Sequence, residues 1–549
     1  MAYELYPPFY KKHQFDEKGK FDMMHYIMRA YKSILPIKGK ERKRTVGGDT
    51  KELLSKVKIY IPKNDFVYFL DTTKTIAVSG NIISNVTINY AKLLYHPFDE
   101  LVQEAIRGEQ SVDEYEREIK LVTEGIENLR IRTLDVIKAS TLSGEVKEKR
   151  ITDFENMLIK PVIGFEEALQ PVLFFNQIIW QTRHRLNGFG RMDKYLEDFY
   201  KTDIASGILT RDIADSLLDD FLEKLSMYSS YKSDALEGDI GQIIILGGLD
   251  PSGVYFFNDL TERFLLTQAR SKRPDPKTFL RVSEKMPKSL MEIAVECLKA
   301  KTGSLLFSND DVVIPALLEF EIPEEDAYNY CISACWEPFI VGKSFDQNNL
   351  AVFDYLVSFD ELKWAKDPFV SLLTENCNKT RRDISEGGAR YSNYGITTVG
   401  LANVIDSLFN IKYLVYEKKK YKLQQMAEAR ESDFSNDEEL YTWCQRQKHY
   451  GPDNKDVICL VNRITENLAE VAEGYHNKYG GMVKFGHGSP VYNMLSKKLR
   501  GIFPAEKQEC LTIPIYHVPM QATQRLRTLQ GSLSTAGTDL MVRMVRFWV

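Results

Sequence analysis

Cys335 and Glu337 are the residues of this sequence whose types and spacing most clearly suggest chemistry. They lie in the segment CISACWEP, residues 331–338, which follows an acidic, helix-like stretch and ends at a proline, so we expect a break between elements there. A cysteine close to a carboxylate offers a sulfur nucleophile or radical beside a group that accepts or donates a proton. Spacing alone favours a buried structural cysteine, with Glu337 on the surface, because free cysteine is among the most buried residue types.

The carboxylate limits which sulfur chemistry this pair can support. A negative charge nearby raises the pKa of a thiol and disfavours the thiolate that ordinary nucleophilic catalysis needs. A mechanism that uses the sulfur as a hydrogen-atom carrier needs no thiolate and escapes this penalty. Cys335 and Glu337 therefore suit chemistry that combines a hydrogen-atom shuttle with a base.

A second candidate segment is HRLNGFGRMD, residues 184–193. Its glycines allow tight turns, and its charged residues could converge on a polar substrate. Each residue also has a plainer interpretation, with His184 as a satisfied structural histidine and Arg191 with Asp193 as an ion pair. Taken alone, the segment favours structure over function.

Several familiar kinds of site are missing from the sequence. No G-x-x-x-x-G-K-S/T or G-x-G-x-x-G loop indicates a nucleotide, no H-E-x-x-H motif is present, and the eight histidines are dispersed. The seven cysteines are scattered without a C-x-x-C pair, which is typical of reduced cytoplasmic thiols. We therefore predict no metal site and no bound cofactor.

The bulk properties are those of an ordinary globular chain. Of 549 residues, 44% are hydrophobic and 27% are charged, and the net charge of −5 gives no sign of a nucleic-acid-binding surface. The basic cluster at residues 38–44 is typical of a solvated loop. No apolar run approaches the roughly 20 residues that cross a bilayer, and the first residues do not resemble a secretory signal. We therefore predict a cytoplasmic protein with no membrane span.

Helical and strand patterns alternate along most of the chain. From about residue 161, helical segments alternate with short β-rich runs that end in glycine, proline or serine, which predicts an α/β core. Helically spaced apolar residues in a charged background predict a long surface helix over residues 112–137. The other predicted helices are 21–35, 97–106 and part of 416–439, and the predicted strands are 57–61, 241–246, 279–282 and 312–314.

The breaks between these elements resemble, in order, motifs of the pyruvate formate-lyase-like glycyl radical enzymes. The resemblance covers roughly residues 170–490. The first matching segment is Gly190 to Asp193 with Tyr195, Phe199 and Tyr200, which resembles the family's GR-x-D-Q-Y…FY with Lys194 in place of Gln. The next are Gly247, Gly248, Asp250 and Gly253 (the family's GG-x-D-x-x-G), Arg281 in a segment like the family's short strand, and residues 309–317 (ND-x-x-x-IPAL). The last are residues 335–338 (G-C-V-E-P, with Ala334 and Trp336 as departures) and residues 388–391 and 400–408 (GARY…GLANVADSL).

This resemblance implies an α/β fold, a ten-stranded barrel surrounded by helices with the cysteine loop inside it. It implies that Cys335, as a thiyl radical, abstracts a hydrogen atom, that Glu337 handles the proton, and that Asp193 helps to bind a substrate hydroxyl or amine. His184 and Asn349 are weaker candidates for the pocket. The eliminating branch of the family has one cysteine and a glutamate two residues later, whereas the formate-lyase branch has two adjacent cysteines. The resemblance thus favours radical elimination, of the dehydratase or lyase kind, over formate acetyltransferase-type acyl transfer.

The resemblance also implies domains and partners. The implied domains are residues 1–150, a mostly helical region; 151–500, the barrel; and 501–549, an atypical tail. In such enzymes a radical-SAM activating enzyme installs a glycyl radical on a C-terminal loop, that radical generates the thiyl radical, and dimers are common. No segment up to Val549 resembles the R-V-x-G-Y motif that bears the radical glycine, so we expect this chain to be inactive alone. The alternatives are a frameshift, a separate glycyl-loop polypeptide, and a non-catalytic barrel that binds a small molecule or a partner chain.

Overall fold

The computed structural model describes the chain between residues 45 and 488, with gaps. The chain divides into two compact units, one of residues 1–347 with 362–392 and one of residues 348–361 with 393–549. The described ranges are 45–61, 66–67, 76, 86–106, 113–182, 184, 187–226, 242–271, 273, 276–300, 305–333, 337–345, 347–351, 364–399, 401–432, 434–447, 455–474 and 476–488. The helix predicted at 21–35, the basic cluster at 38–44 and the tail at 501–549 lie outside them. The predicted domain boundaries stay predictions.

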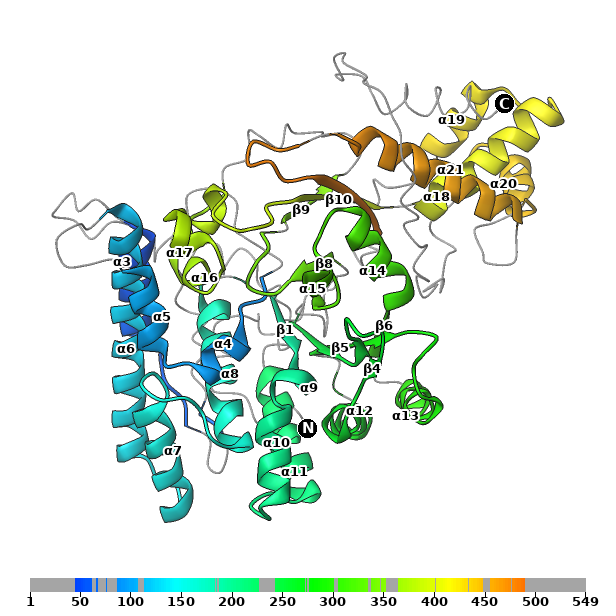
Figure 1. The fold of residues 1–549 in the computed structure, drawn as a ribbon. Coiled ribbons are helices and arrows are strands. Elements are labelled where there is room, and N and C mark those ends of the chain that lie inside the picture. Colours follow the sequence, from blue (N-terminus) through cyan, green and yellow to red (C-terminus); the bar gives the residue numbers. More distant parts are fainter. Residues whose placement is uncertain are drawn as a thin grey trace. The chain divides into compact units, whose positions relative to one another are not determined.

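The first five described helices of unit 1 precede the sheet: α3 (Val46–Lys56), α4 (Tyr90–Tyr95), α5 (Phe98–Ala105), α6 (Glu114–Ala139) and α7 (Gly144–Asn156). Helices α3, α5 and α7 pack against α6, and α4 packs against α8 (Phe165–Gln181). Helices α3, α6 and α7 lie side by side (Figure 1). The side chain of Asp113 accepts a hydrogen bond of 2.9 Å from the Glu116 amide, which caps the first turn of α6. The helices predicted over 97–106 and 112–137 are therefore confirmed.

Helix α8 (Phe165–Gln181) leads from these helices to the sheet. Every side chain from Ala168 to Gln181 is buried, as expected of a largely apolar helix enclosed in a core. Its polar side chains have buried partners: Gln170 exchanges hydrogen bonds of 2.8 and 3.2 Å with the main chain of Val67. A central, fully enclosed helix gives the following strand a fixed starting point.

Four parallel strands form the main sheet of unit 1, in the order β1-β2-β5-β6. All side chains of β1 and β2 are buried, and such continuous buried runs are typical of parallel strands covered on both faces. The strands predicted at 241–246 and 279–282 are confirmed as β2 and β5. The strands are β1 (Asn187–Arg191), β2 (Gln242–Leu246), β5 (Lys277–Val282) and β6 (Leu305–Asn309), and the helices between them are α9 (Met192–Tyr195), α10 (Glu197–Ala205), α11 (Arg211–Ser226), α12 (Asp259–Ser271) and α13 (Lys288–Lys299).

The strand predicted at 312–314 is wrong, because these residues belong to helix α14 (Asp310–Glu319). The side chain of Asn309 accepts a hydrogen bond of 3.0 Å from the Asp311 amide and caps the helix, while acidic residues in the first turn favour its amino end. The β-branched residues then supply the buried helix face. Local capping outweighs β propensity here.

The strand predicted at 57–61 is also wrong. Among the described residues this segment is irregular, apart from a bridge residue at Tyr60. Val57 terminates α3, and the Arg132 guanidinium takes up the carbonyls of Leu54 and Val57 through hydrogen bonds of 2.6 and 2.7 Å. The carbonyls of Leu54 and Val57 therefore accept hydrogen bonds from a side chain and not from a neighbouring strand.

Two short hairpins and several short helices complete unit 1. In the β7–β8 hairpin the strands are antiparallel and Ser333 pairs with Glu337; the three residues between the strands, 334–336, lie outside the described ranges. The elements are β3 (Gly248–Leu249), β4 (Tyr255–Phe256), α15 (Glu324–Ala327), β7 (Tyr330–Ser333), β8 (Glu337–Ile340), α16 (Pro368–Leu372), α17 (Cys377–Thr380) and η4 (Ile384–Glu386).

Unit 2 contains a three-stranded sheet in the order β11-β10-β9, whose β10 and β11 are parallel, and a helical cluster around a buried apolar core. Within the predicted helical stretch 416–439, most side chains of α19 are exposed. The elements are β9 (Gln347–Ala351), β10 (Tyr394–Val399), α18 (Leu401–Ile411), η5 (Lys412–Glu417), α19 (Leu423–Glu431), α20 (Glu438–Gln445), α21 (Lys455–Ala472) and β11 (Val483–Gly488).

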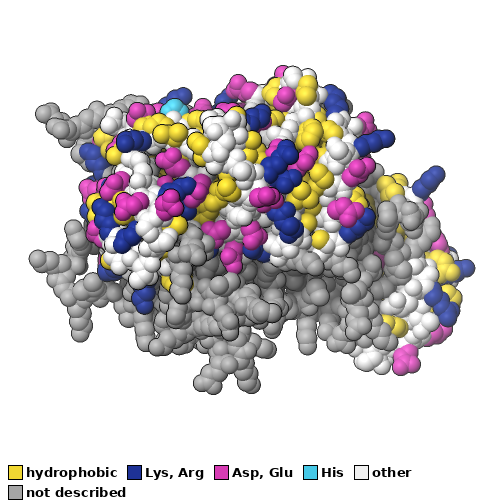
Figure 2. All heavy atoms as spheres, turned by 90° about the horizontal axis from the view of Figure 1, so that it is seen from below, with side chains coloured by type: hydrophobic (Ala, Val, Ile, Leu, Met, Phe, Trp, Pro, Cys, Tyr) yellow, Lys and Arg dark blue, Asp and Glu magenta, His cyan; other side chains and the backbone are white. Residues whose placement is uncertain are grey.

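The surface offers no segregated charge on the face that Figure 2 shows. Acidic and basic side chains are interspersed there among apolar ones. None of the described helices is both long enough and apolar enough to traverse a lipid bilayer.

Candidate active site

The β7–β8 hairpin lies very close to strand β1, and glycines make this possible. A Cβ atom on Gly188 would lie 2.4 Å from Thr87 Oγ1 and 3.3 Å from the carbonyl oxygen of Ile332 in β7. The ladder between β1 and β2 shifts register between Gly188 and Gly190, and Gly190 has a φ of +68°, which favours glycine. The glycines of residues 188–190 therefore let the hairpin approach the strand, in addition to allowing the bend predicted for them.

Arg281 holds the beginning of β7. Its guanidinium forms a bidentate ion pair with Asp310 (2.8 and 2.9 Å), and its Nη1 donates to the carbonyls of Tyr328 (2.9 Å) and Tyr330 (3.2 Å). The Tyr330 ring lies 4.1 Å from the guanidinium carbon. Burial works against the charged form of Arg281, but Tyr330 and Asp310 outweigh it and raise the pKa of the guanidinium.

Asp310 completes this network from the other side. It accepts further hydrogen bonds from the Tyr330 hydroxyl (2.7 Å) and the Leu249 amide (2.6 Å), and neither Asp310 nor Arg281 is exposed to solvent. Gly248 has a φ of +111°, and a Cβ atom there would lie 2.6 Å from Arg281 Nε. The network is therefore fully hydrogen-bonded and closely enclosed. We call Arg281, Asp310 and Tyr330 the root cluster.

Asp193, predicted to contact substrate, lies below the turn that follows β2. Its Oδ2 accepts hydrogen bonds from the Gly247 amide (2.7 Å) and the Thr261 hydroxyl (2.8 Å), whereas Oδ1 has no hydrogen-bond partner among the described residues. Burial raises the pKa of the Asp193 carboxyl, and nearby Arg191 acts in the opposite direction. Its visible contacts are structural, and its substrate role stays a prediction.

Arg191 does not pair directly with Asp193, contrary to the ion pair expected from spacing. None of its guanidinium nitrogen atoms makes a hydrogen bond to a described residue, and its Cζ lies 5.2 Å from the centre of the Phe256 ring. Burial lowers the pKa of this guanidinium to about 10. A buried arginine of this kind contrasts with the fully paired Arg281.

His184 is buried at the amino end of β1. Its Nε2 hydrogen-bonds the carboxylate of Asp367, which also caps α16 by accepting a hydrogen bond of 2.8 Å from the Val370 amide. Asn187 donates to the His184 carbonyl at 2.9 Å, so both the ring and the main chain of His184 are fixed. No pattern in the sequence points to Asp367, because it lies 183 residues from its partner.

A second buried aspartate lies behind Asp367. Both carboxylate oxygens of Asp383 accept from the Asp367 amide at 3.1 Å, and the hydroxyls of Ser371 (2.9 Å) and Ser385 (2.6 Å) also donate to it. Burial raises the pKa of Asp383 to about 6. The result is a chain of polar contacts that ends at the His184 imidazole.

The remaining predicted residues are placed only in part. Cys335 lies in residues 334–336, outside the described ranges; Glu337 is the first residue of β8, opposite Ser333; and Asn349 lies in β9 of unit 2. The direction of β7 is informative. It starts at the root cluster, near the carboxyl ends of β5 and β6, and reaches Gly188 near the amino end of β1 with Ile332. It therefore runs toward the end of the sheet where His184 lies.

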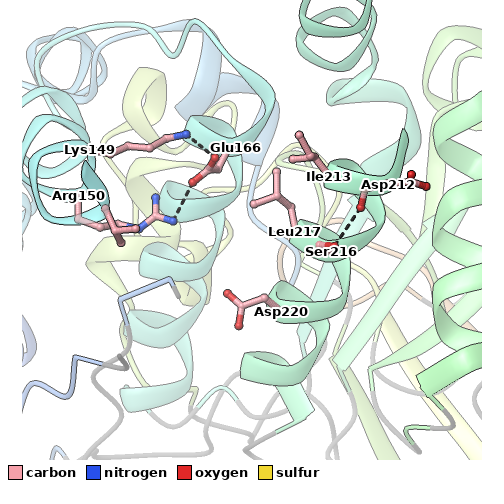
Figure 3. Close-up of a pocket in the computed structure, with 9 residues that line it drawn as sticks. Lys149, Arg150, Glu166, Asp212, Ile213, Ser216, Leu217 and Asp220 are labelled. Atoms are coloured by element: carbon pink, nitrogen blue, oxygen red, sulfur yellow. Dashed lines mark hydrogen bonds and ion pairs between the residues drawn. The ribbon is translucent and has the colours of Figure 1, made fainter. Parts of the chain in front are cut away.

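A cleft of about 380 Å³ lies elsewhere in unit 1, among α7, α8 and α11 (Figure 3). The basic residues of the cleft are already paired, since Lys149 and Arg150 both contact Glu166. The carboxylate of Asp220 binds Lys224. Its lining residues do not include any of the predicted site residues. Among the described residues, no group of three or more His, Cys, Asp and Glu side chains is arranged to hold a metal ion.

Solved structures of similar architecture identify the fold. The structure superposes on the glycerol-bound, B12-independent glycerol dehydratase from Clostridium butyricum with a TM-score of 0.66 and 21% identity, over 75% of this chain and 62% of that one. It superposes on hydroxyproline dehydratase from Clostridioides difficile, with its substrate bound, with a TM-score of 0.66 and 18% identity, over 77% and 64%. The fold is that of the glycyl radical enzymes, an α/β barrel with helices around it.

The family follows from the sequence itself. The model of the pyruvate formate lyase-like family matches residues 81–360 and 356–495, which is most of the chain. This chain belongs to the pyruvate formate lyase-like family of glycyl radical enzymes. The prediction made from the ordered motifs is confirmed.

Named relatives are about a quarter identical to this chain over the aligned parts. (2S)-3-sulfopropanediol dehydratase from Klebsiella oxytoca is 24% identical in an alignment 478 residues long that covers 72% of this chain and 58% of the relative. Isethionate sulfite-lyase from Bilophila wadsworthia is 24% identical in an alignment 394 residues long that covers 59% of this chain and 47% of the relative. The chain thus spans about half to three fifths of the length of these relatives.

Proposed function

We propose that this protein provides the barrel of a glycyl radical eliminase that breaks a C–O or C–N bond in a small polar substrate. The observation that carries the proposal is the β7–β8 hairpin, which bears the CISACWEP segment, lies against β1 and is held at its base by a buried ion pair. A glycyl radical of the kind that relatives carry would supply the initial radical at Cys335. The chain's own residues would do the rest.

In this proposal the Cys335 thiyl radical takes a hydrogen atom from a substrate carbon, which leaves a thiol and a carbon radical. The neighbouring C–O or C–N bond then breaks, and Glu337 relays a proton from the substrate to the leaving group, which departs as water or an amine. The product radical recovers a hydrogen atom from the Cys335 thiol, and the thiyl radical is restored. The cycle consumes no oxidant or reductant.

Other residues would bind and orient the substrate. His184 is the best supported, because Asp367 fixes its imidazole at the end of the sheet toward which β7 runs. Asp193 is a proposed contact by carry-over from the family motif, and Asn349 is a weaker candidate for the pocket. The relatives support elimination over acyl transfer, since most of those named are dehydratases or lyases.

The proposed partners are a small-molecule substrate, a radical-SAM activating enzyme and a second copy of the chain. We propose a cytoplasmic location, where thiols remain reduced. The free cysteines of the described residues, which include the exposed Cys459, support that location.

Anaerobic reconstitution tests the function. The full chain would be incubated with a radical-SAM activating enzyme, S-adenosylmethionine and a polypeptide that supplies a glycyl loop, and then given glycerol, 1,2-propanediol or trans-4-hydroxy-L-proline. We expect a dehydrated product, its loss with Cys335→Ala, and a fall of about 100-fold in kcat with Glu337→Gln.

The matched control is Cys331→Ala, because Cys331 is a buried thiol in the same hairpin. This variant should retain turnover. Turnover that survives Cys335→Ala would contradict the radical role. Ligand binding without turnover in every combination would instead indicate a non-catalytic barrel.

A further inference from the structure

The β7–β8 hairpin is too short to hold its own orientation. Each strand has four residues, and an isolated two-stranded hairpin is marginal even when longer. Its orientation must therefore come from contacts outside it. The contact of Ile332 with β1 is steric, since a Cβ atom on Gly188 would lie 3.3 Å from the Ile332 carbonyl oxygen, and it limits how close the hairpin lies without fixing its direction.

The root cluster provides directional contacts at the point where the chain enters β7. Arg281 Nη1 donates to two main-chain carbonyls, those of Tyr328 and Tyr330, on either side of the entry into β7. The Tyr330 side chain is held as well, because its hydroxyl contacts Asp310 (2.7 Å) and Ser308 (2.8 Å). Both the main chain and the side chain of Tyr330 are thus fixed, by Arg281 of β5, Ser308 of β6 and Asp310 of α14.

Stability alone does not explain such a pair. Removing two charges from water costs so much that well-packed apolar residues often stabilise a core equally well. What an ion pair adds is geometry, since a bidentate arginine fixes both distance and angle. Nε and Nη2 of Arg281 bind Asp310, which leaves Nη1 directed at the hairpin.

We propose that Arg281, oriented by Asp310 and stacked on Tyr330, is a positioning residue that sets the direction of the β7–β8 hairpin. Through that direction it sets where Cys335 and Glu337 meet the substrate, a part of the inference that rests on the proposed function. Arg281 acts through the main chain of residues 328 and 330 and does not contact the reacting atoms.

The test compares Arg281→Met with Arg150→Met, which removes another buried arginine that pairs with an aspartate far from the hairpin. In the full chain, amide hydrogen exchange would be followed by mass spectrometry for residues 330–333 and 337–340. We expect exchange there to accelerate at least about tenfold in Arg281→Met and to stay within about twofold in Arg150→Met. Equal acceleration in both variants would overturn the proposal.

A ratio of alkylation rates gives a readout that global destabilisation does not move. The rate at which iodoacetamide alkylates Cys335 would be divided by the rate for the exposed Cys459 of the same molecule, at one pH. Arg281→Met should change this ratio at least about fivefold, and Arg150→Met should leave it within about twofold. A ratio that does not change in Arg281→Met would overturn the proposal.

If Arg281→Met does not fold, Arg281→Lys replaces it, because lysine keeps the charge but cannot form the fork that reaches two carbonyls and a carboxylate. The same two readouts apply, and wild-type values in Arg281→Lys would overturn the proposal. Neither readout needs turnover. A loosened hairpin in a chain that never turns over would therefore support the positioning role and contradict only the proposed function.

Discussion

Two regions of unit 1 contain a buried arginine that pairs with an aspartate and stacks on an aromatic ring, but the two arginines hold different parts of the structure. Arg150 donates to Asp153 at 2.7 Å and to Glu166 at 2.9 Å, and its Cζ lies 4.7 Å from the centre of the Phe66 ring. Arg281 also donates to main-chain carbonyls, whereas these hydrogen bonds of Arg150 go to side chains. The Nε of Arg150 has no hydrogen-bond partner among the described residues.

The difference lies in what each arginine fixes. Arg150 joins α7 to the start of α8 beside the cleft through its ion pair with Glu166 (Figure 3). Arg281 fixes main-chain carbonyls, and a main chain that is fixed at one end of a short hairpin transmits the constraint to the other end. Similar arginine–aspartate pairs can therefore either join helices or orient a strand, according to the third group that the arginine binds.

The largest expected effect comes from removing the carboxylate of each pair. Asp310→Ala leaves Arg281 buried without a counter-charge and should lower the free energy of unfolding by about 3–5 kcal/mol. Asp153→Ala leaves Arg150 its bond to Glu166 and should cost only about 1–2 kcal/mol. Urea denaturation of both variants measures this, and equal losses would remove the distinction between the two regions.

Close packing of the hairpin predicts the next effect. Gly188→Ala would place a Cβ atom 2.4 Å from Thr87 Oγ1 and 3.3 Å from the Ile332 carbonyl, so we expect a loss of about 2–3 kcal/mol. Gly144→Ala is the matched control, because nothing lies within 4 Å of that position. Urea denaturation should show no loss for the control. If both variants are equally stable, the close approach of Thr87 and Ile332 to β1 does not require glycine at position 188.

The Arg150 region should also show a pH dependence. Burial raises the pKa of Asp153 to about 6, with Arg150 acting in the opposite direction. The ordinary value is about 3.9, so the folded protein binds this proton more tightly than the unfolded chain. The resulting stabilisation is present below about pH 4 and is lost as the pH rises to about 6.

We expect this loss to reach about 2 kcal/mol. Unfolding free energies measured in urea at pH 4, 5, 6 and 7 should fall less steeply in Asp153→Asn than in the wild type. The difference between the two curves isolates this group from the other carboxylates. Parallel curves would contradict the raised pKa.

Much of the fold was predictable where one local signal dominates. The periodicity of α6 and the continuous apolar run of β2 predicted their elements correctly. The run 312–314 failed, because its three β-branched residues suggest a strand while the Asn309 cap, a few residues earlier, starts a helix. Helix capping and β propensity favour different structures for the same residues, and the sequence alone does not show which of the two is stronger.

The site was predictable only through the order of its motifs. Cys335 and Glu337 stood out by type, but their spacing also suited a structural thiol. Partners that are distant in sequence gave no signal: Arg281 and Asp310 lie 29 residues apart, and His184 and Asp367 lie 183 apart. Long-range pairs depend on how the strands are brought together, which no local pattern encodes.

The smallest expected effect separates the two groups that hold Tyr330. Tyr330→Phe keeps the ring that stacks on Arg281 but removes the hydroxyl bonds to Asp310 and Ser308, so we expect a loss of about 1–2 kcal/mol in urea denaturation. Tyr95→Phe is the control, since its hydroxyl makes only long bonds of 3.3 and 3.4 Å at the surface and should cost less than about 0.5 kcal/mol. Hydrogen exchange in the hairpin should stay close to wild type in both variants, because Arg281 still holds the carbonyls of Tyr328 and Tyr330. If Tyr330→Phe loosens the hairpin as much as Arg281→Met, the hydroxyl and not the guanidinium sets its direction.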